Sequence, residues 1–307
     1  MFKLQRHRRV ILEPIQNHPW ESQAVFNPAA IREGEHVHLI YRAVEGDNYS
    51  TLGYARLDRQ GNLLARWPKP ILGREAPHEL RGVEDPRVAK FDDRYYLVYV
   101  AYDGVTVRVC LASTADFQHL ERHGIIIPEV WDKDAMFFPE QVKGQLVLMH
   151  RIEPNIQLAF FKDMQHVLRP EKEYWRTHFN RLDDFTAMRP RFWWEARKIG
   201  GGAPPIPTPE GWLVIYHGVD DKLVYRAGAA LLDYENPLRV IARFPEPILA
   251  PERDFERVGD VPNVVFPTGT ALFGDELLVY YGGADKAIGV ATASLSELLH
   301  ELGGHRA

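Results

Sequence analysis

The 307-residue sequence predicts an all-β protein, namely a five-bladed β-propeller with a short C-terminal helix. Three features support this: one strand pattern recurs five times, turn-forming residues punctuate the whole chain, and helical periodicity is scarce. Each copy begins with a short apolar run that is rich in aromatic and β-branched residues, as strands are. These first runs span 36–42, 94–100, 144–151, 211–217 and 276–282.

A second strand-like run follows each first run. The second runs span 51–57, 105–111, 156–161, 223–232 and 286–295. Aligned on Tyr41, Tyr99, His150, Tyr216 and Tyr280, the copies lie 58, 51, 66 and 64 residues apart. That spacing accommodates a four-stranded antiparallel sheet, and a closed ring of such sheets leaves no exposed sheet edge. The alternative, a two-sheet sandwich with long insertions, accounts poorly for the regular spacing.

Turn and cap signals delimit these predicted elements. EGDN at 45–48, FDDR at 91–94 and VDDK at 219–222 are turn sequences, and 22 prolines and 23 glycines are spread along the chain. Ser294 and Glu297 form a capping box ahead of LLHEL, which predicts a short closing helix. Length alone does not choose between one large core and two domains. Because the repeats run through the chain, we expect one domain over residues 1–307.

Composition restricts the partners and the compartment. The chain has 42 acidic and 37 basic residues, a net charge of −5, so it lacks the basic excess that binds nucleic acid, and any anion must be held by a local cluster. The single cysteine, Cys110, excludes an internal disulfide and a cysteine metal site, and we expect it to be a buried thiol. No apolar stretch approaches the roughly 18 residues of a membrane span, and the N-terminal VIL run is too short for a signal peptide. We expect a cytoplasmic protein; a secreted protein that has lost its leader is the alternative.

The sequence GVEDPR at 82–87 carries two adjacent carboxylates, a proline and an arginine. The residue before a proline avoids the helical region, so Asp85 is expected at an extended strand entry or a turn, with its side chain directed by the backbone. That placement suits a general acid. The alternative is an ordinary Asp-Pro turn.

Polar residues end three of the first runs: Arg42, Arg151 and His217. The innermost strands of a propeller line its central channel, so residues that are distant in sequence converge there. Because the three residues occupy the same place in their repeats, we expect them to form an anion pocket.

Many motifs, in order from about residue 20 to 300, resemble those of glycoside hydrolase family 130, the β-mannoside phosphorylases. The motifs are NPAAI at 27–31, YRAVEGDNYSTLGYA at 41–55, GVEDPR at 82–87, KDAMFFPE at 133–140, LMHRIEPNI at 148–156, KIGGGAPPI at 198–206, IYHGV at 215–219, VPNVVFPTG at 261–269 and YYGGAD at 280–285. The resemblance implies inverting phosphorolysis. Inorganic phosphate attacks the anomeric carbon of a non-reducing β-mannosyl residue and releases α-D-mannose 1-phosphate and a shortened acceptor.

The resemblance also implies a role for each matching residue. Asp85 is the general acid and acts through the mannose 3-hydroxyl. The phosphate-binding positions are Arg151, Lys198 and His217, with Lys133 as a fourth cation. The positions that hold sugar hydroxyls are Asn27, Arg42 and Asp285. No metal and no cofactor is implied, because inorganic phosphate is a co-substrate, and members of the family commonly form homo-oligomers.

Each assignment has a structural alternative. Arg151 could pair with Glu153 or Glu140 in a channel salt bridge, and Lys198 could be a solvated loop lysine. His217 could be a satisfied core histidine, and Asp285 could cap a turn. The glycine run at 200–202 lacks the lysine and the helix of a phosphate loop, which excludes a nucleotide site of that kind. The aromatic run RFWWEA at 191–196 is equally compatible with a sugar platform, core or an oligomer interface.

The chemistry of the predicted cations favours a phosphorylase over a hydrolase. An inverting hydrolase needs a second carboxylate to activate water, whereas phosphate arrives as an anion and needs cations to hold it in line. The hydrolase alternative would use Glu140, Glu195 or another carboxylate as base. A third possibility is a non-catalytic propeller that binds carbohydrate or a protein. We expect β-1,4-mannooligosaccharides as substrates, because the compact chain lacks the extensions associated with the mannosylglucose-specific branch of the family. A β-1,2-mannobiose-type phosphorylase is the alternative, since rim loops such as 165–197 carry no pattern that specifies the acceptor.

Overall fold

The computed structural model describes residues 2–128 and 130–306, and most of its regular structure is β-strand. The strands form five antiparallel units, numbered here in chain order. Unit 1 contains β2 (Ala24–Glu33), β3 (His36–Val44), β4 (Ser50–Asp58) and β5 (Leu63–Arg66); unit 2 contains β6 (Gly82–Phe91), β7 (Arg94–Tyr102), β8 (Val107–Thr114) and β9 (Glu121–Ile127). Unit 3 contains β10 (Lys133–Phe137), β11 (Leu146–Arg151), β12 (Ile156–Phe161) and β13 (Thr186–Met188).

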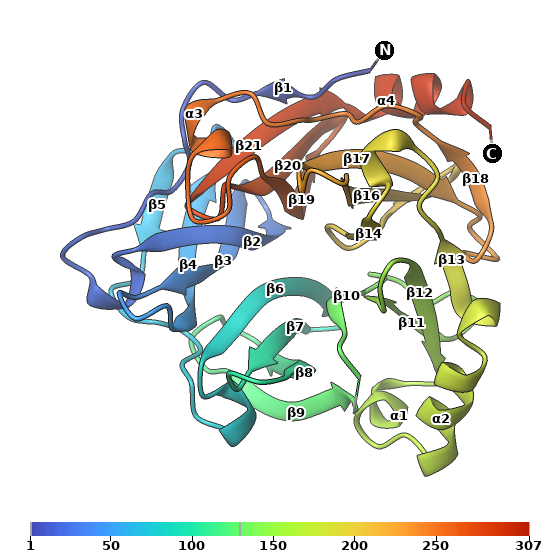
Figure 1. Ribbon diagram of the computed structural model, residues 1–307, viewed down its shortest axis with the longest axis horizontal. Helices are drawn as coiled ribbons and strands as arrows, with labels where there is room; N and C mark the ends of the chain where they lie inside the picture. The colour runs from blue at the N-terminus through green and yellow to red at the C-terminus, as the bar shows by residue number, and fades with distance from the viewer. Residues whose placement is uncertain (1, 129, 307) are drawn as a thin grey trace.

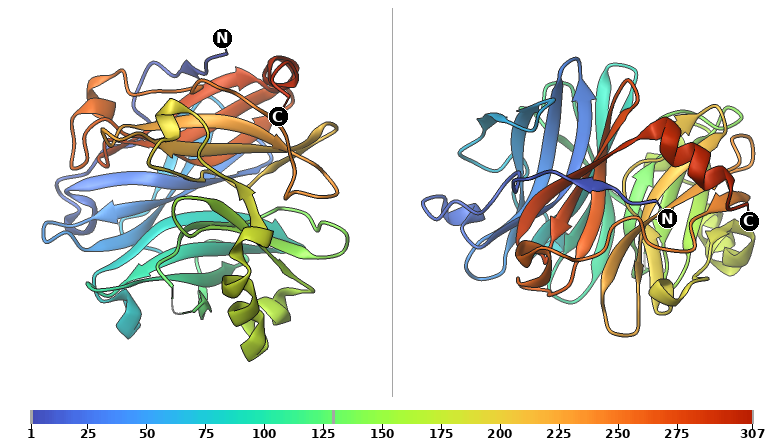
Figure 2. Two further views of the ribbon diagram at one scale, coloured as in Figure 1. Left: turned by 45° about the vertical axis from the view of Figure 1, so that its right-hand side comes forward. Right: turned by 90° about the horizontal axis from the view of Figure 1, so that it is seen from above.

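Units 4 and 5 complete the arrangement. Unit 4 contains β14 (Lys198–Gly201), β15 (Ile206–Thr208), β16 (Gly211–Val219), β17 (Tyr225–Leu232) and β18 (Val240–Arg243). Unit 5 contains β19 (Val265–Phe273), β20 (Glu276–Gly283), β21 (Ala287–Ser294) and the N-terminal strand β1 (Gln5–Arg6), which pairs with β21. Figure 1 shows the units arranged around a common centre, and Figure 2 shows β1 running along the last unit.

The all-β prediction is confirmed, and its strand runs match β3, β7, β11, β16 and β20 and the strands that follow each of them. By hydrogen bonding alone there are four sheets, because a single parallel bridge between Ser50 and Gly82 joins units 1 and 2. The first runs are the second strands of their units. The strands before them, β2, β6, β10 and β14, contact one another in succession, and β19 contacts β2. These preceding strands therefore surround the centre.

Short helices lie between the strands. They are α1 (Met164–Leu168), α2 (Lys172–Asn180), α3 (Asp254–Arg257) and α4 (Leu295–Gly303), with 3-10 turns η1 (Pro19–Glu21), η2 (Pro77–Glu79), η3 (Leu182–Phe185) and η4 (Trp193–Glu195). The predicted C-terminal helix is α4, and Ser294 caps it by accepting a hydrogen bond from the Glu297 backbone. Helices α1 and α2 form an insertion between β12 and β13 that the sequence analysis did not anticipate. In the described part of the chain, no helix is long and apolar enough to cross a membrane.

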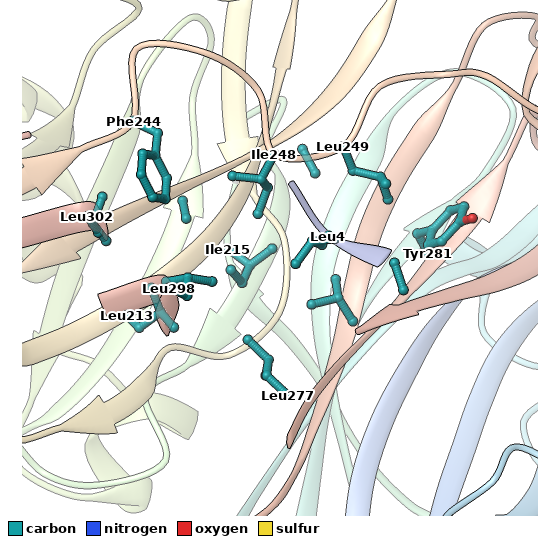
Figure 3. Close-up of a cluster of buried hydrophobic side chains, with 14 of the residues drawn as sticks. Leu4, Leu213, Ile215, Phe244, Ile248, Leu249, Leu277, Tyr281, Leu298 and Leu302 are labelled. Carbon is teal, nitrogen blue, oxygen red and sulfur yellow. The ribbon is translucent and has the colours of Figure 1, made fainter. Parts of the chain in front are cut away.

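Five of the clusters that form the hydrophobic core each lie between two neighbouring units, and a small sixth cluster lies within unit 1. Units 4 and 5, for example, contribute Leu213 and Leu277 to one cluster, which Leu298 and Leu302 of α4 cover (Figure 3). Further clusters join units 5 and 1, 1 and 2, 2 and 3, and 3 and 4. Every unit is thus packed on both faces. Cys110 is buried in one of these clusters, as expected.

A buried glutamate, a tyrosine and an arginine form the same trio in four of the units. The glutamate precedes the first strand of its unit, the tyrosine lies on the second strand, and the arginine lies on the outermost strand. The trios are Glu21–Tyr41–Arg66, Glu79–Tyr99–Arg122, Glu195–Tyr216–Arg243 and Glu256–Tyr281–Arg6. All four glutamates are 0% exposed, and each tyrosine hydroxyl donates to its glutamate over 2.6–2.8 Å.

The trios correct one position of the repeat alignment. In unit 5 the aligned residue is Tyr281 and not Tyr280, because the hydroxyl of Tyr281 donates to Glu256 over 2.7 Å. Tyr280 points to the opposite face of the sheet, into the cluster shared with unit 1. Its buried hydroxyl has no hydrogen-bond partner among the described residues. Alternation of side chains along a strand separates two adjacent tyrosines that the sequence pattern treats alike.

The two tyrosines provide a matched test of the trio. Tyr281→Phe should lower the free energy of unfolding by about 1–2 kcal/mol, because it leaves a buried carboxylate short of a donor. Tyr280→Phe should change it by less than about 0.5 kcal/mol, because no hydrogen bond is lost. Denaturant unfolding of both variants measures the difference. Equal losses in the two variants would contradict a stabilising role for the trio.

Candidate active site

A cavity of about 440 Å³ collects side chains from all five units. Seven of the eight predicted site residues line it: Asn27, Arg42, Asp85, Lys133, Arg151, Lys198 and Asp285. The eighth, His217, is fully buried behind the lining, where its ring lies 4.4 Å from that of Phe266. Asp134 and Tyr225 also line the cavity, although neither was predicted as a site residue from the sequence. A larger hollow of about 700 Å³ around Arg59 and Glu276 contains none of the predicted site residues.

Local backbone geometry turns three polar residues toward the cavity. Asn27, Asp85 and Asp134 have φ angles of 47°, 48° and 55° and sit at register shifts in the first strands β2, β6 and β10. Asp85 lies on strand β6, in keeping with the strand entry or turn expected for it, but a β-bulge places its backbone in the left-handed region in spite of the following proline. An alignment of the first strands would have revealed Asp134, because its place in β10 matches that of Asp85 in β6.

Asp85 lies within a network of polar side chains. Its Oδ1 accepts a hydrogen bond from Asn27 Nδ2 at 2.9 Å and lies 3.5 Å from Arg42 Nη1. Burial by itself would raise the pKa of the Asp85 carboxyl, but Arg42, Lys133 and the Asn27 hydrogen bond outweigh burial and hold the pKa below its ordinary value. Asp85 is therefore a carboxylate in the ligand-free site.

Asp285 is the opposite case. Burial, together with the nearby charges of Asp85 and Asp260, outweighs the attraction of Arg42 and raises the pKa of the Asp285 carboxyl to about 7. Asp85 and Asp285 both lie near the positive charge of Arg42, yet they favour different protonation states. This is expected where two like charges share a site. Near neutral pH, Asp285 can donate a hydrogen bond while Asp85 accepts one.

Cations occupy the other side of the cavity. Arg151 Nε lies 3.2 Å from Asp134 Oδ2, and its Nη1 lies 3.4 Å from Glu153 Oε1. The same Glu153 oxygen accepts from Lys198 Nζ at 2.7 Å. The predicted alternative pairing of Arg151 with Glu153 is thus present, and Lys198 is not a solvated lysine because the same carboxylate holds it. Glu140 is bound to Tyr234 on the surface. Lys133 faces the acid side, with Nζ 3.7 Å from Glu84 Oε2.

His217 is a neutral donor in this site. Burial lowers the pKa of its imidazole to about 3, and Arg151, Lys198 and Arg87 add to the effect against the opposing charge of Asp134. Neither ring nitrogen has a hydrogen-bond partner among the described residues, and the same is true of Nε of Arg151 and Oδ2 of Asp134. Buried polar atoms of this kind cost free energy unless a ligand completes them. A Cβ atom at Gly200 would overlap with Asp134 and His217, which explains the first glycine of the GGG run.

The arrangement is that of an enzyme active site, with a carboxyl pair, Asp85 and Asp285, on one side of the cavity and the cations Arg151 and Lys198 on the other. The chain belongs to glycoside hydrolase family 130. The family model, described as beta-1,4-mannooligosaccharide phosphorylase, matches residues 4–302. The family resemblance inferred from the motifs is confirmed, and the chain is a glycoside phosphorylase of the mannoside-acting type.

Individual relatives extend over almost the whole chain. It is 41% identical to a 1,2-beta-oligomannan phosphorylase of Thermoanaerobacter sp., with 97% of this chain and 99% of the relative covered. It is 42% identical to a beta-1,2-mannobiose phosphorylase of the same organism, with 95% and 97% covered. Among solved structures, the beta-1,2-mannobiose phosphorylase of Listeria innocua in complex with beta-1,2-mannobiose superimposes with a TM-score of 0.85 at 27% identity, covering 98% of this chain and 99% of that one.

The raised pKa of Asp285 predicts a pH-dependent effect of Asp285→Asn. Between its ordinary value of 3.8 and the folded value of about 7, the folded state keeps a proton that the unfolded state has lost, so stability falls as pH rises through this window. The substitution removes this penalty. At about 1.4 kcal/mol per unit, its gain in unfolding free energy should be about 2 kcal/mol larger at pH 8 than at pH 5.5.

Thermal and denaturant unfolding at the two pH values measure this difference. Asp92→Asn is the matched control, because Asp92 is exposed and shares the left-handed backbone, with φ 53°. An identical effect of Asp285→Asn at both pH values would show that the pKa of Asp285 is not raised.

Proposed function

We propose that this protein catalyses the inverting phosphorolysis of β-1,2-linked mannooligosaccharides and releases α-D-mannose 1-phosphate. The observation that carries the proposal is that Asp85, Arg151 and Lys198 line one cavity, with His217 buried directly behind the lining near Asp134. The two Thermoanaerobacter relatives and the Listeria structure favour the β-1,2 linkage over the β-1,4 linkage expected from the sequence. That expectation had little physical basis, because linkage depends on rim loops whose sequence carries no readable pattern.

In this proposal the two sides of the cavity act on opposite faces of one mannosyl residue. Asn27, Arg42 and Asp285 hold sugar hydroxyls, and phosphate binds against Arg151, Lys198 and His217. Phosphate oxygen forms the new bond to the anomeric carbon as the glycosidic bond breaks. Asp85 supplies the proton to the departing oxygen through the mannose 3-hydroxyl and becomes a carboxylate. Bound phosphate offsets the positive field that lowers the pKa of Asp85, so the acid form is favoured once both substrates are present.

The hydrolase alternative is less well supported. Glu195, one of the bases proposed for it, is fully buried and accepts hydrogen bonds from Tyr216 and Arg243. Glu140, the other, lies outside the cavity lining. Glu153 is a carboxylate on the basic side, and it is the residue that a hydrolytic reaction would require as base. The non-catalytic alternative is not retained, because the chain belongs to a family of enzymes.

We also propose that the five units are the blades of a five-bladed β-propeller and that residues 1–307 form a single catalytic domain. The five inter-unit clusters and the pairing of β1 with β21 support this, since each unit packs on two neighbours and the first strand completes the last sheet. The cytoplasmic location, the homo-oligomeric state and the lack of a cofactor or metal stay predictions.

The reaction can be tested directly by NMR. The protein is incubated with β-1,2-mannobiose, β-1,2-mannotriose or β-1,4-mannobiose, with and without inorganic phosphate, and phosphorus and anomeric proton signals are followed. We expect α-mannose 1-phosphate from the β-1,2 substrates only when phosphate is present. Faster turnover of β-1,4-mannobiose would overturn the linkage, and free mannose without phosphate would establish the hydrolase.

The basic side predicts opposite effects for two substitutions. Lys198→Ala should raise the KM for phosphate by at least about tenfold, with a smaller change for the mannoside, because a charged hydrogen bond to the anion is lost. Glu153→Gln should lower the KM for phosphate, because this carboxylate competes for Lys198 and Arg151. Initial rates at varied phosphate and varied mannoside separate the two constants.

Lys90→Ala provides the control for the loss of a lysine, since Lys90 pairs with Glu33 away from the cavity lining. Equal changes in both Michaelis constants for Lys198→Ala would show that Lys198 does not bind phosphate.

Asp85→Asn should abolish turnover, because the amide cannot act as the acid, and it should leave the unfolding transition in place.

A further inference from the structure

Unit 3 departs from the glutamate–tyrosine–arginine trio of the other four units. Asp132 precedes its first strand, where the others have glutamate, and His150 occupies the aligned position on its second strand, where they have tyrosine. The third member is His178, which comes from helix α2 of the insertion and not from an outer strand. The three side chains are as buried as the trios, with exposed fractions of 1%, 0% and 2%.

Hydrogen bonds connect the three residues in series. His150 Nδ1 lies 2.6 Å from Asp132 Oδ2, and His150 Nε2 lies 2.9 Å from His178 Nε2. A contact between two ring nitrogens at this distance requires one proton between them. Burial, followed by the neighbouring His150, lowers the pKa of His178 to about 3, so His178 is neutral. With His150 donating Nδ1–H to the carboxylate, its Nε2 accepts from the Nε2–H of His178.

The series ends at the backbone of a predicted phosphate-binding residue. The other oxygen of Asp132, Oδ1, accepts the backbone N–H of Arg151 at 3.0 Å. Asp132 directly precedes Lys133 and Asp134 in the chain, and Lys133 pairs with Arg151 across β10 and β11. Both strands that present cavity residues in unit 3 are therefore held by the same carboxylate.

The same geometry recurs at the cavity in other units. Arg42 follows Tyr41 and His217 follows Tyr216, just as Arg151 follows His150. Successive residues of a strand point to opposite sides, so a residue anchored on one side fixes the direction of its neighbour. In unit 3 this anchor depends on a helix. Three aromatic rings pack against the His178 ring. The distances between ring centroids are 5.4 Å for Trp175, 5.8 Å for Phe179 and 4.5 Å for Phe185.

We propose that His178 is a positioning residue for phosphate use: helix α2 supplies it to the His178–His150–Asp132 series, which fixes the backbone and direction of Arg151. This inference rests on the proposed function, in which Arg151 binds phosphate. Without the donor from His178, the His150 ring loses one of its two hydrogen bonds. Asp132 then loses a fixed partner, and Arg151 is held less firmly toward the anion. The residues proposed to hold the sugar, Asn27, Arg42 and Asp285, lie on units 1 and 5 and are not members of the series.

Two substitutions of similar size separate hydrogen bonding from packing. His178→Leu fills the aromatic pocket without a donor, whereas His178→Gln keeps a side-chain N–H. We expect His178→Leu to raise the KM for phosphate about tenfold, with the KM for β-1,2-mannobiose changed less than about twofold, and His178→Gln to restore most of the loss. Arg176→Ala alters the same helix outside the series, since the exposed Arg176 pairs with Glu173 on the surface, and it should leave both constants near the wild-type values.

Stabilisation by inorganic phosphate alone, measured by thermal unfolding of the full chain, gives a second readout. Phosphate should raise the Tm of the wild type and of His178→Gln more than that of His178→Leu. Equal behaviour of the leucine and glutamine variants, or equal effects on both Michaelis constants, would overturn the positioning role. If the wild type neither turns over with phosphate nor is stabilised by it, the proposed function fails first, and the role of His178 falls with it. If the wild type uses phosphate and the variants match it, only the role of His178 is overturned.

Discussion

The buried carboxylate of each unit is the constraint on which the rest of the molecule depends. Glutamates with no exposed surface lie in four units, and a charge removed from water in this way destabilises a fold unless donors surround it. The tyrosine of the second strand and the arginine of the outermost strand provide those donors. Each carboxylate therefore joins the segment before the sheet, the middle of the sheet and its outer edge, and the register of one unit cannot shift without leaving a charge unpaired.

The same carboxylates determine what the centre of the molecule presents. The residue after each aligned tyrosine or histidine points away from the trio, and in units 1, 3 and 4 that residue is Arg42, Arg151 or His217. On the first strands, bulges at Asn27 and Asp85 turn two more polar side chains inward. The same strand geometry therefore produces both the stabilising contacts at the periphery and the polar cavity residues at the centre.

Charge is divided within the cavity in a way that suits two substrates. Asp85, Asp285 and Glu84 surround Arg42 on one side, whereas Arg151, Lys198 and the neutral His217 surround Asp134 and Glu153 on the other side. Neither side has an isolated charge. In the proposed function, phosphate oxygens take over contacts that Glu153 makes with Arg151 and Lys198, so the site needs no large excess of buried positive charge before phosphate binds.

The sequence alone determined two central strands of each unit, the closing helix, the family and seven lining residues, because side-chain alternation, capping and motif order are local properties of the chain. It did not distinguish Tyr280 from Tyr281, since adjacent tyrosines satisfy the same pattern until one meets Glu256. Only the tertiary structure decided that Glu153 lies between Arg151 and Lys198, that Asp134 belongs to the cavity, and that His178 reaches His150 from an inserted helix. These contacts join residues from different strands and loops, and they exist only once the packed units bring those segments together.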